Sequence, residues 1–408
     1  MFLIIFWSVF LNYAQTQNLF YADVFRGGVT GAGFALSFDG FGGGNIQVNI
    51  PSSSSIKQAF LISGRNGNAP DLTIDFDGNL LTFNSTNQVS VIFQSLFGGN
   101  SGVHIIDVTS IVNASQSIYS INVPTWQQAG FNRYNEFYLY VLYENASLPI
   151  VNTYLFLNNQ DFGFVNYLVS NIAPIDNNND VGLSLLTGYI GDTLMDEENI
   201  FVNNNFVGLI GGNDINSGIA GGPYGDFYYE NNQLFGLSDD TANTQMYKSD
   251  VLLNMSFLTS FNATSFILDC IPLTTNPMNR SNNVWSFFLA YTNNCDTFST
   301  SATATQDTIC KGEAVQLQAT GGATYSWFSA FGGLSDTSIA NPIASPPQTT
   351  TYIVTIKNDS GCVKTEHVKI WVRQSLSQIL LLLLLKLVAT QMAALLWVLF
   401  LMVLHHLL

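Results

Sequence analysis

Thr308–Trp327 reads TICKGEAVQLQATGGATYSW, and Thr349–Val372 reads TTTYIVTIKNDSGCVKTEHVKIWV. Both stretches alternate apolar and polar residues, which places Val315, Leu317 and Ala319 on one side of a strand. Gly-Gly and Asn-Asp-Ser-Gly turns separate the alternating runs. Alternation with period two, interrupted by a turn at about every ten residues, predicts a small antiparallel sandwich.

These residues resemble the immunoglobulin-like, PKD-like module of secreted, adhesin-type surface proteins that are associated with gliding motility in Bacteroidetes. The likeness covers residues 300–373. It rests on Cys310 after the first strand, Tyr325-x-Trp327 on the third, Thr350-Thr351-Tyr352-x-Val354-Thr355, and Gly361-Cys362 at the last hairpin. The resemblance implies a spacer or adhesive unit without catalytic residues. From the pattern itself we expect Trp327 in the core and Tyr325 at its rim.

The composition indicates a β-rich extracellular protein. The 408 residues are enough for two or three domains, and they include 31 Phe and 17 Tyr but only 10% charged residues. The 28 acidic and 12 basic residues give a net charge of −16, which repels phosphate backbones and argues against a nucleic-acid partner. This charge fits a soluble secreted protein, or one that gathers divalent cations.

The N-terminus predicts a secretory signal peptide over residues 1–14. An apolar run, Met1–Leu11, precedes the small residue Ala14 and is too short to span a bilayer. A basic n-region is missing. The alternative is a buried first strand.

Residues 18–298 have a β pattern throughout. Asp77-Gly78 is a hairpin signal between two short apolar runs. Candidate strands before residue 144 are Asn45–Ile50, Gln58–Ser63, Asp71–Phe76, Leu80–Asn84, Gln88–Phe93, Val103–Val108, Ile118–Val123 and Phe137–Tyr143. The predicted fold class is therefore all-β: tandem antiparallel β-sandwiches, with one or two jelly-roll-like sandwiches before the Ig-like one.

A weak internal repeat divides this region. The hairpin at Asp77-Gly78 corresponds to the one at Asn203-Asn204, and similar aromatic strands follow in each half. We predict a β-sandwich over 18–160 and a second over 161–298 that repeats the first, the alternative being one large sandwich. Tyr138–Pro149 also resembles a strand of uncharacterised β-domains in bacterial and archaeal surface proteins, which implies a surface location.

The four cysteines predict disulfides and an oxidising compartment. Their order favours two local pairs, Cys270–Cys295 and Cys310–Cys362, although four cysteines allow three connectivities. A metal site at these residues is disfavoured, because they form no Cys-x-x-Cys and have no histidine nearby.

The sequence offers little for catalysis. Its histidines are His104 in an apolar strand, His367 near a predicted exposed edge, and two in the C-terminal tail. No nucleophile elbow, phosphate-binding glycine loop or zinc-protease motif is present. We therefore expect no enzyme activity, no catalytic residues and no organic cofactor.

One acidic loop is a candidate calcium site. Asp176, Asn178 and Asp180 place two carboxylates and an amide oxygen close together, and calcium binds six to eight such oxygens. The loop lacks the spacing and closing glutamate of an EF-hand. A solvated turn is the alternative that the Asn-rich composition favours.

The tail, 374–408, switches abruptly to apolar residues. Ile379–Leu404 is long enough for a transmembrane helix, for which about 20 residues suffice. The alternative is a reading-frame shift, because a shifted reading places glycines after Met392, Trp397 and Met402 and then resembles the repeat of gliding-motility adhesins. In that case the natural protein continues past residue 408.

Together these features predict a non-enzymatic, secreted cell-surface protein that acts as an adhesin or a structural spacer. Its expected partners are extracellular or cell-surface glycans or proteins, and a membrane only if the tail is a genuine helix. The alternative is an accessory carbohydrate- or calcium-binding region of a larger secreted enzyme.

Overall fold

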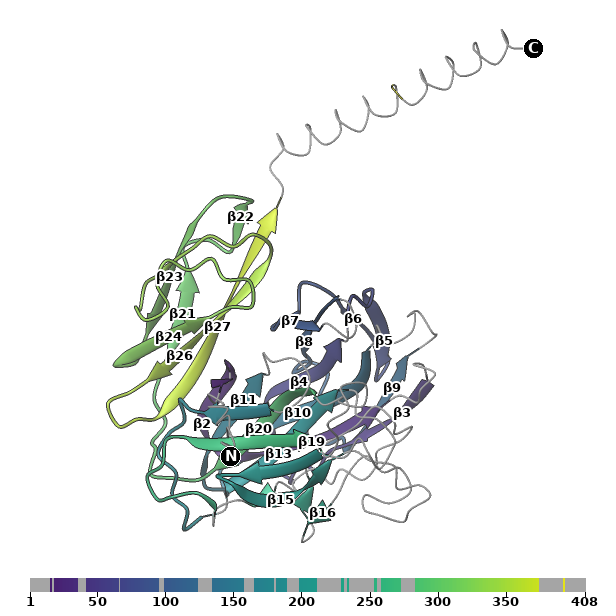
Figure 1. Cartoon of the computed structure of the whole chain (residues 1–408), viewed down its shortest axis with the longest axis vertical. Coiled ribbons are helices and arrows are strands. Elements are labelled where there is room, and N and C mark those ends of the chain that lie inside the picture. Colours follow the sequence, from purple (N-terminus) through teal and green to yellow (C-terminus); the bar gives the residue numbers. More distant parts are fainter. Residues whose placement is uncertain are drawn as a thin grey trace, which may run out of the picture.

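The computed structural model describes residues 15–16, 18–35, 42–65, 67–94, 99–123, 134–157, 165–179, 181–188, 198–210, 229–230, 233–234, 253–254, 258–272, 283–373 and 392. The elements that these residues form are all β-strands, which confirms the predicted all-β class of tandem sandwiches (Figure 1). The predicted signal peptide and all of the apolar tail but Met392 lie outside the described residues.

The first sandwich contains the strands between residues 18 and 144. They are β2 (Asn18–Ala35), β3 (Gly42–Gln47), β4 (Ser55–Arg65), β5 (Leu72–Phe76), β6 (Asn79–Phe83), β7 (Ile92–Gln94), β8 (Gly99–Asp107), β9 (Ile118–Val123) and β10 (Tyr134–Glu144). One sheet has the order β2-β10-β4-β8, with β7 at its edge, and the other has the order β3-β9-β5-β6. This is the strand order of a jelly roll, so we call the unit the first roll.

The second roll repeats this order. Its strands are β11 (Ile150–Leu157), β12 (Val165–Val169), β13 (Val181–Gly188), β14 (Glu198–Val202), β15 (Asn205–Ile210), β18 (Leu253–Asn254), β19 (Phe266–Pro272) and β20 (Asn283–Tyr291). They form β11-β20-β13-β18 and β12-β19-β14-β15, with β1 (Gln15–Thr16) beside β12. A separate pair, β16 (Tyr229–Glu230) and β17 (Gln233–Leu234), completes the described part of this region.

The two predicted hairpins occupy equivalent positions in the rolls. Asp77 and Gly78 join β5 to β6, and Asn203 and Asn204 join β14 to β15. All four residues have positive φ, as the two-residue turn that matches strand twist requires. The two hairpins therefore lie at the same step of the strand order in each roll.

The rolls are joined through their first strands. β2 pairs with β11 from Asn18 to Arg26, which merges the larger sheets of both rolls into one nine-stranded sheet. By topology the second roll begins at β11, before the predicted boundary at residue 161. The second roll begins this early because a short turn follows β10 and leads directly into β11. In this turn the Asn145 side chain accepts a hydrogen bond from Ser147 and donates one to Ser54.

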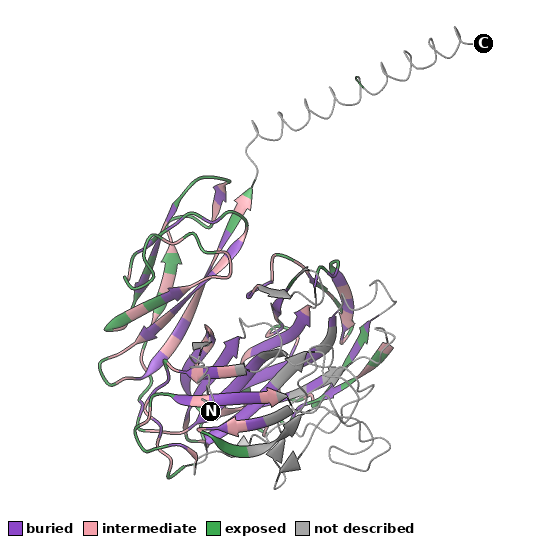
Figure 2. Ribbon diagram, in the orientation of Figure 1, coloured by how far each residue is buried: buried purple, intermediate pink, exposed green. Residues whose placement is uncertain are grey.

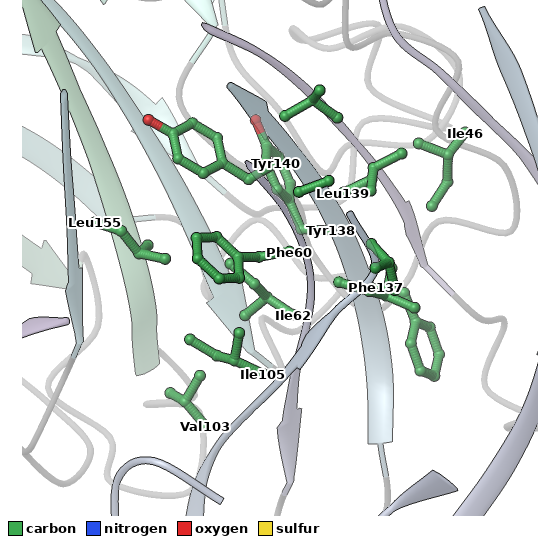
Figure 3. Packing of buried hydrophobic residues seen from close by; sticks show 14 of the residues in the cluster. Ile46, Phe60, Ile62, Val103, Ile105, Phe137, Tyr138, Leu139, Tyr140 and Leu155 are labelled. Atoms are coloured by element: carbon green, nitrogen blue, oxygen red, sulfur yellow. The ribbon is translucent and has the colours of Figure 1, made fainter. Parts of the chain in front are cut away.

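Aromatic side chains extend the contact between the rolls. Tyr138 and Tyr140 of β10 stack on Phe288 of β20, with ring centroids 4.8 and 4.1 Å apart. The tyrosines cross β2 where it has no side chain: a Cβ on Gly31 would lie 2.4 Å from the Tyr138 hydroxyl oxygen. Figure 3 shows Tyr138 and Tyr140 near Phe60, within the buried cluster of the first roll. The two rolls therefore share packed side chains as well as strand hydrogen bonds.

The C-terminal module, residues 301–373, is a smaller sandwich. Its strands are β21 (Ser301–Ala304), β22 (Thr308–Cys310), β23 (Val315–Thr320), β24 (Thr324–Phe328), β25 (Ile343–Ala344), β26 (Thr350–Lys357) and β27 (Val363–Arg373). They form the sheets β21-β23-β25 and β22-β27-β26-β24. The predicted inward row Val315, Leu317 and Ala319 is buried, and so is Trp327, whose indole N–H donates to the Ile339 carbonyl at 2.9 Å. Along β23, buried residues alternate with intermediate or exposed ones (Figure 2).

Within the described part of the chain, no helix has the length and apolarity needed to cross a bilayer.

Removing the ring that bridges the rolls should destabilise the protein strongly. We expect Phe288→Ala to lower the free energy of unfolding by about 3–5 kcal/mol, because it leaves a cavity against two stacked tyrosines. Phe206→Ala is the control: Phe206 is 47% exposed, so the loss should stay below about 1 kcal/mol. Urea unfolding of both variants measures the difference, and equal losses would contradict the packing described.

Candidate functional site: the junction of the rolls and the C-terminal module

The C-terminal module meets the rolls at a length of β2 whose backbone has no strand partner on one side. β11 pairs with β2 from Asn18 to Arg26, whereas β10, on the other side of β2, pairs with it only from Gly27 onward. Phe20 and Ala22 therefore have no strand partner on the β10 side. Unpaired backbone groups in a buried strand are costly, so this stretch requires another partner.

Two side chains of β27 supply that partner. The Thr365 hydroxyl oxygen accepts a hydrogen bond from the Ala22 N–H at 2.7 Å and lies 3.4 Å from the Ala22 carbonyl oxygen. The His367 Nε2 donates a hydrogen bond to the Phe20 carbonyl oxygen at 2.7 Å. The imidazole also packs on the Phe20 ring, with the ring centroids 4.6 Å apart. The module thus provides hydrogen-bond partners for the β2 backbone from side chains instead of from a paired strand.

Burial keeps His367 in the form that this contact needs. Desolvation lowers the pKa of His367, and the hydrogen bond to Phe20 and the charge of Asp107 offset this only in part. The imidazole is therefore neutral, with its proton on Nε2 facing the carbonyl. The sequence had placed His367 near an exposed edge, and this expectation is corrected: the ring is partly buried against β2.

A charged cluster crosses the same junction. The buried Asp23 of β2 binds Lys364 of the module at 2.8 Å and Lys57 of β4 at 3.2 Å. Lys57 also binds Glu144 at 3.1 Å. Burial lowers the pKa of Lys57, but the two carboxylates outweigh it and the pKa is raised. Burial and Asp23 together raise the pKa of Tyr21, whose hydroxyl donates to Asp23.

One disulfide closes the junction covalently. Cys295, just after β20, is bonded to Cys362 in the β26–β27 turn, with the Cα atoms 5.7 Å apart. Val24 and Ala173 pack around the two cysteines, and Val363 joins the hydrophobic core of the second roll. The first residues of β27 are therefore part of the rolls' packing as much as of the module's.

The predicted pairs Cys270–Cys295 and Cys310–Cys362 are wrong. Cys310 of β22 lies opposite Arg373 in the hydrogen-bond ladder between β22 and β27. Arg373 is the last residue of the 11-residue strand β27, whereas Cys362 lies just before its first residue. That strand spans roughly 35 Å, whereas disulfide Cα atoms lie about 4–7 Å apart. Cys270 is buried in β19, within the core of the second roll. Proximity in the sequence was misleading because the module folds back onto the rolls.

Several cavities flank the junction, and two of them are larger than 500 Å³. The first, of about 670 Å³, is lined by Arg26, Lys57 and Lys364 with Glu144 and several hydroxyl groups. The second, of about 550 Å³, is lined by Phe60, Asp107 and His367 among others. Three of the chain's 12 basic residues line the first cavity, but Lys57 and Lys364 already bind carboxylates. Their charge serves the junction itself.

The predicted calcium loop is described only in part. The Asp176 carboxylate accepts from the Asn178 backbone N–H at 3.1 Å, from the Asn178 side chain at 2.8 Å and from the Asn179 side chain at 3.1 Å. Asp180 lies outside the described residues. In the described ranges, no three His, Cys, Asp or Glu side chains converge as metal ligands would. The contacts of Asp176 are those of a self-bonded turn, and calcium binding stays a prediction.

His104 occupies a structural position. It is buried in β8, with Nδ1 3.0 Å from the Asn87 side-chain oxygen and Nε2 3.5 Å from the Tyr134 hydroxyl. Burial, assisted by the charge of Arg65, lowers the pKa of His104 to about 3. A neutral imidazole held by an amide and a phenol stabilises the first roll.

Sequence reasoning missed the residues that build the junction, among them Asp23, Lys364 and Thr365. The available signal was Asp23, an isolated charge in an apolar run of a chain with few charges. Its partner Lys364 follows more than 300 residues later, and no local pattern links the two.

Thr365 provides a direct test of the junction. We expect Thr365→Val to lower the free energy of unfolding by about 1–3 kcal/mol, because the Ala22 N–H would lose its acceptor. Thr365→Ser keeps the hydroxyl and should recover most of the loss. Urea unfolding compares the two variants, and an equally destabilised serine variant would refute the role of the hydroxyl.

The disulfide can be tested by cutting the chain at residues 305–307, which are exposed. A protease site inserted after Gln306 separates Cys295 from Cys362, while Cys310 and Cys362 stay on one fragment. After cleavage we expect one band on a non-reducing gel and two bands after reduction. Cys295→Ser should release the fragments without reductant, and release from the parent protein would contradict the assignment.

The comparison with known families concerns the C-terminal module. The matching segment contains every strand from β21 to β27. No curated protein matches the chain. Residues 299–374 match the family model described as "Ig-like domain CHU_C associated", so the module that closes the junction is similar to that immunoglobulin-like family.

Proposed function

We propose that this chain is a non-enzymatic, secreted cell-surface protein in which the two rolls form the contact surface and the Ig-like module is a structural spacer. The observation that carries the proposal is the fixed junction. A disulfide, an ion pair and backbone-capping side chains attach the spacer to the rolls in one orientation.

A fixed spacer suits adhesion better than a flexible one. An adhesive surface held in one orientation loses less rotational freedom when it binds, so more of its contact energy appears as affinity. The disulfide and the Ig-like module also fit an extracellular location, because disulfides persist mainly in oxidising compartments.

The partners that fit this proposal are extracellular glycans or proteins without strong negative charge. The chain carries a net charge of −16, which disfavours nucleic acids and other polyanions. A membrane partner would depend on the apolar tail, of which Met392 alone is among the described residues.

Binding assays on the full chain test the proposal. We expect beads coated with the protein to adhere to cell-surface glycans or proteins, and a glycan array and an extracellular-protein array identify which. We expect no turnover of glycosidic or peptide substrates. Turnover would overturn the non-enzymatic assignment, and failure to bind either array would overturn the adhesive one.

The same preparation separates the alternative role as an accessory region of a larger secreted enzyme. That role predicts selective binding of the polysaccharide that a companion catalytic region degrades. Melting with calcium or with chelator tests the acidic loop: a calcium-dependent rise in Tm that Asp176→Asn abolishes would establish a calcium site. An unchanged Tm would assign Asp176 to a turn.

A further inference from the structure

The Cys295–Cys362 disulfide changes the covalent route through the C-terminal module. A pull applied between the rolls and any point after Arg373 passes from Cys295 through the two sulfur atoms to Cys362. From there it continues along β27, which begins at Val363. Residues 296–361 form a closed loop beside this route, so tension does not run through them.

β27, the part of the module that does carry tension, is already almost fully extended. β27 has 11 residues in a strand, which rises about 3.3 Å per residue against a limit of about 3.6 Å. Stretching it fully therefore gains only a few Å. Unfolding the module would barely lengthen the tether, so tension does little work in unfolding it.

The non-covalent contacts of β27 act in parallel with this route. Val363 packs in the core of the second roll, Lys364 binds Asp23, and Thr365 accepts from Ala22. The start of β27 is thus attached to the rolls at the same end at which the disulfide enters. The sandwich formed by β21 to β26 packs on the side of this strand and carries none of the load.

We propose that the disulfide makes the Ig-like module a load-bypassed domain, which stays folded under tension because all of its strands except β27 lie outside the covalent path. Reduction of the bond inserts residues 296–361 into that path. With a sequence separation of 67 residues and a starting Cα distance of 5.7 Å, the maximum added length is roughly 230 Å. The bypass holds for any ligand of the rolls and is independent of the adhesive function.

Single-molecule pulling on the full chain, with handles at its two ends, tests this inference. We expect the fully extended oxidised protein to be shorter by roughly 230 Å than the same protein in a thiol reductant. The double variant Cys295→Ser, Cys362→Ser should have the longer extension in both conditions. Cys270→Ser combined with Cys310→Ser is the matched control, and it should keep the short extension until reductant is added.

Equal extensions for the oxidised protein and the Cys295→Ser, Cys362→Ser variant would overturn the bypass. If that variant does not fold, reduction of the folded parent in the instrument gives the same comparison. Non-reducing peptide mapping is the second measurement: the expected result is a linked peptide pair containing Cys295 and Cys362, and any other pairing would overturn the inference. A protein that binds no ligand but shows the length difference would disprove adhesion and leave the bypass standing.

Discussion

The buried backbone of β2 needs hydrogen-bond partners, and three parts of the chain meet along this strand to supply them. β11 pairs with its first half, β10 pairs with its second half, and Thr365 and His367 of β27 cover the remainder around Ala22. A buried peptide group without a partner costs on the order of 1–3 kcal/mol, which is a large part of a domain's net stability. The rolls and the module are therefore assembled around one strand of 18 residues.

The composition of β2 follows from this role. Gly31 makes room for Tyr138, so that the tyrosines of β10 reach Phe288 in the second roll. Asp23 is buried, and it is compensated by Lys57 from the first roll and Lys364 from the module. Removing one member of a buried ionic cluster costs more than the cluster contributes, because the remaining charge is left unpaired. Such a cluster favours one docked arrangement over its neighbours.

An attachment of this kind changes what a spacer can do. A module on a flexible linker separates two surfaces, whereas a module held at several points also transmits orientation. The disulfide adds a covalent route that leaves most of the module outside the line of tension. Orientation and resistance to extension both arise at one end of β27, where the turn at Cys362 meets Cys295.

The sequence by itself determined the all-β class, the Ig-like module with its inward row and buried Trp327, and the hairpin turns at Asp77-Gly78 and Asn203-Asn204. These features depend on period-two alternation and on turn residues, which act over a few positions and are visible in any short window. The tertiary structure alone decided the disulfide partner of Cys295, the start of the second roll at β11, and the junction of Asp23, Thr365 and His367 with their partners. These depend on which surfaces pack together after the strands have formed, and residues more than 300 positions apart leave no local pattern from which that packing can be read.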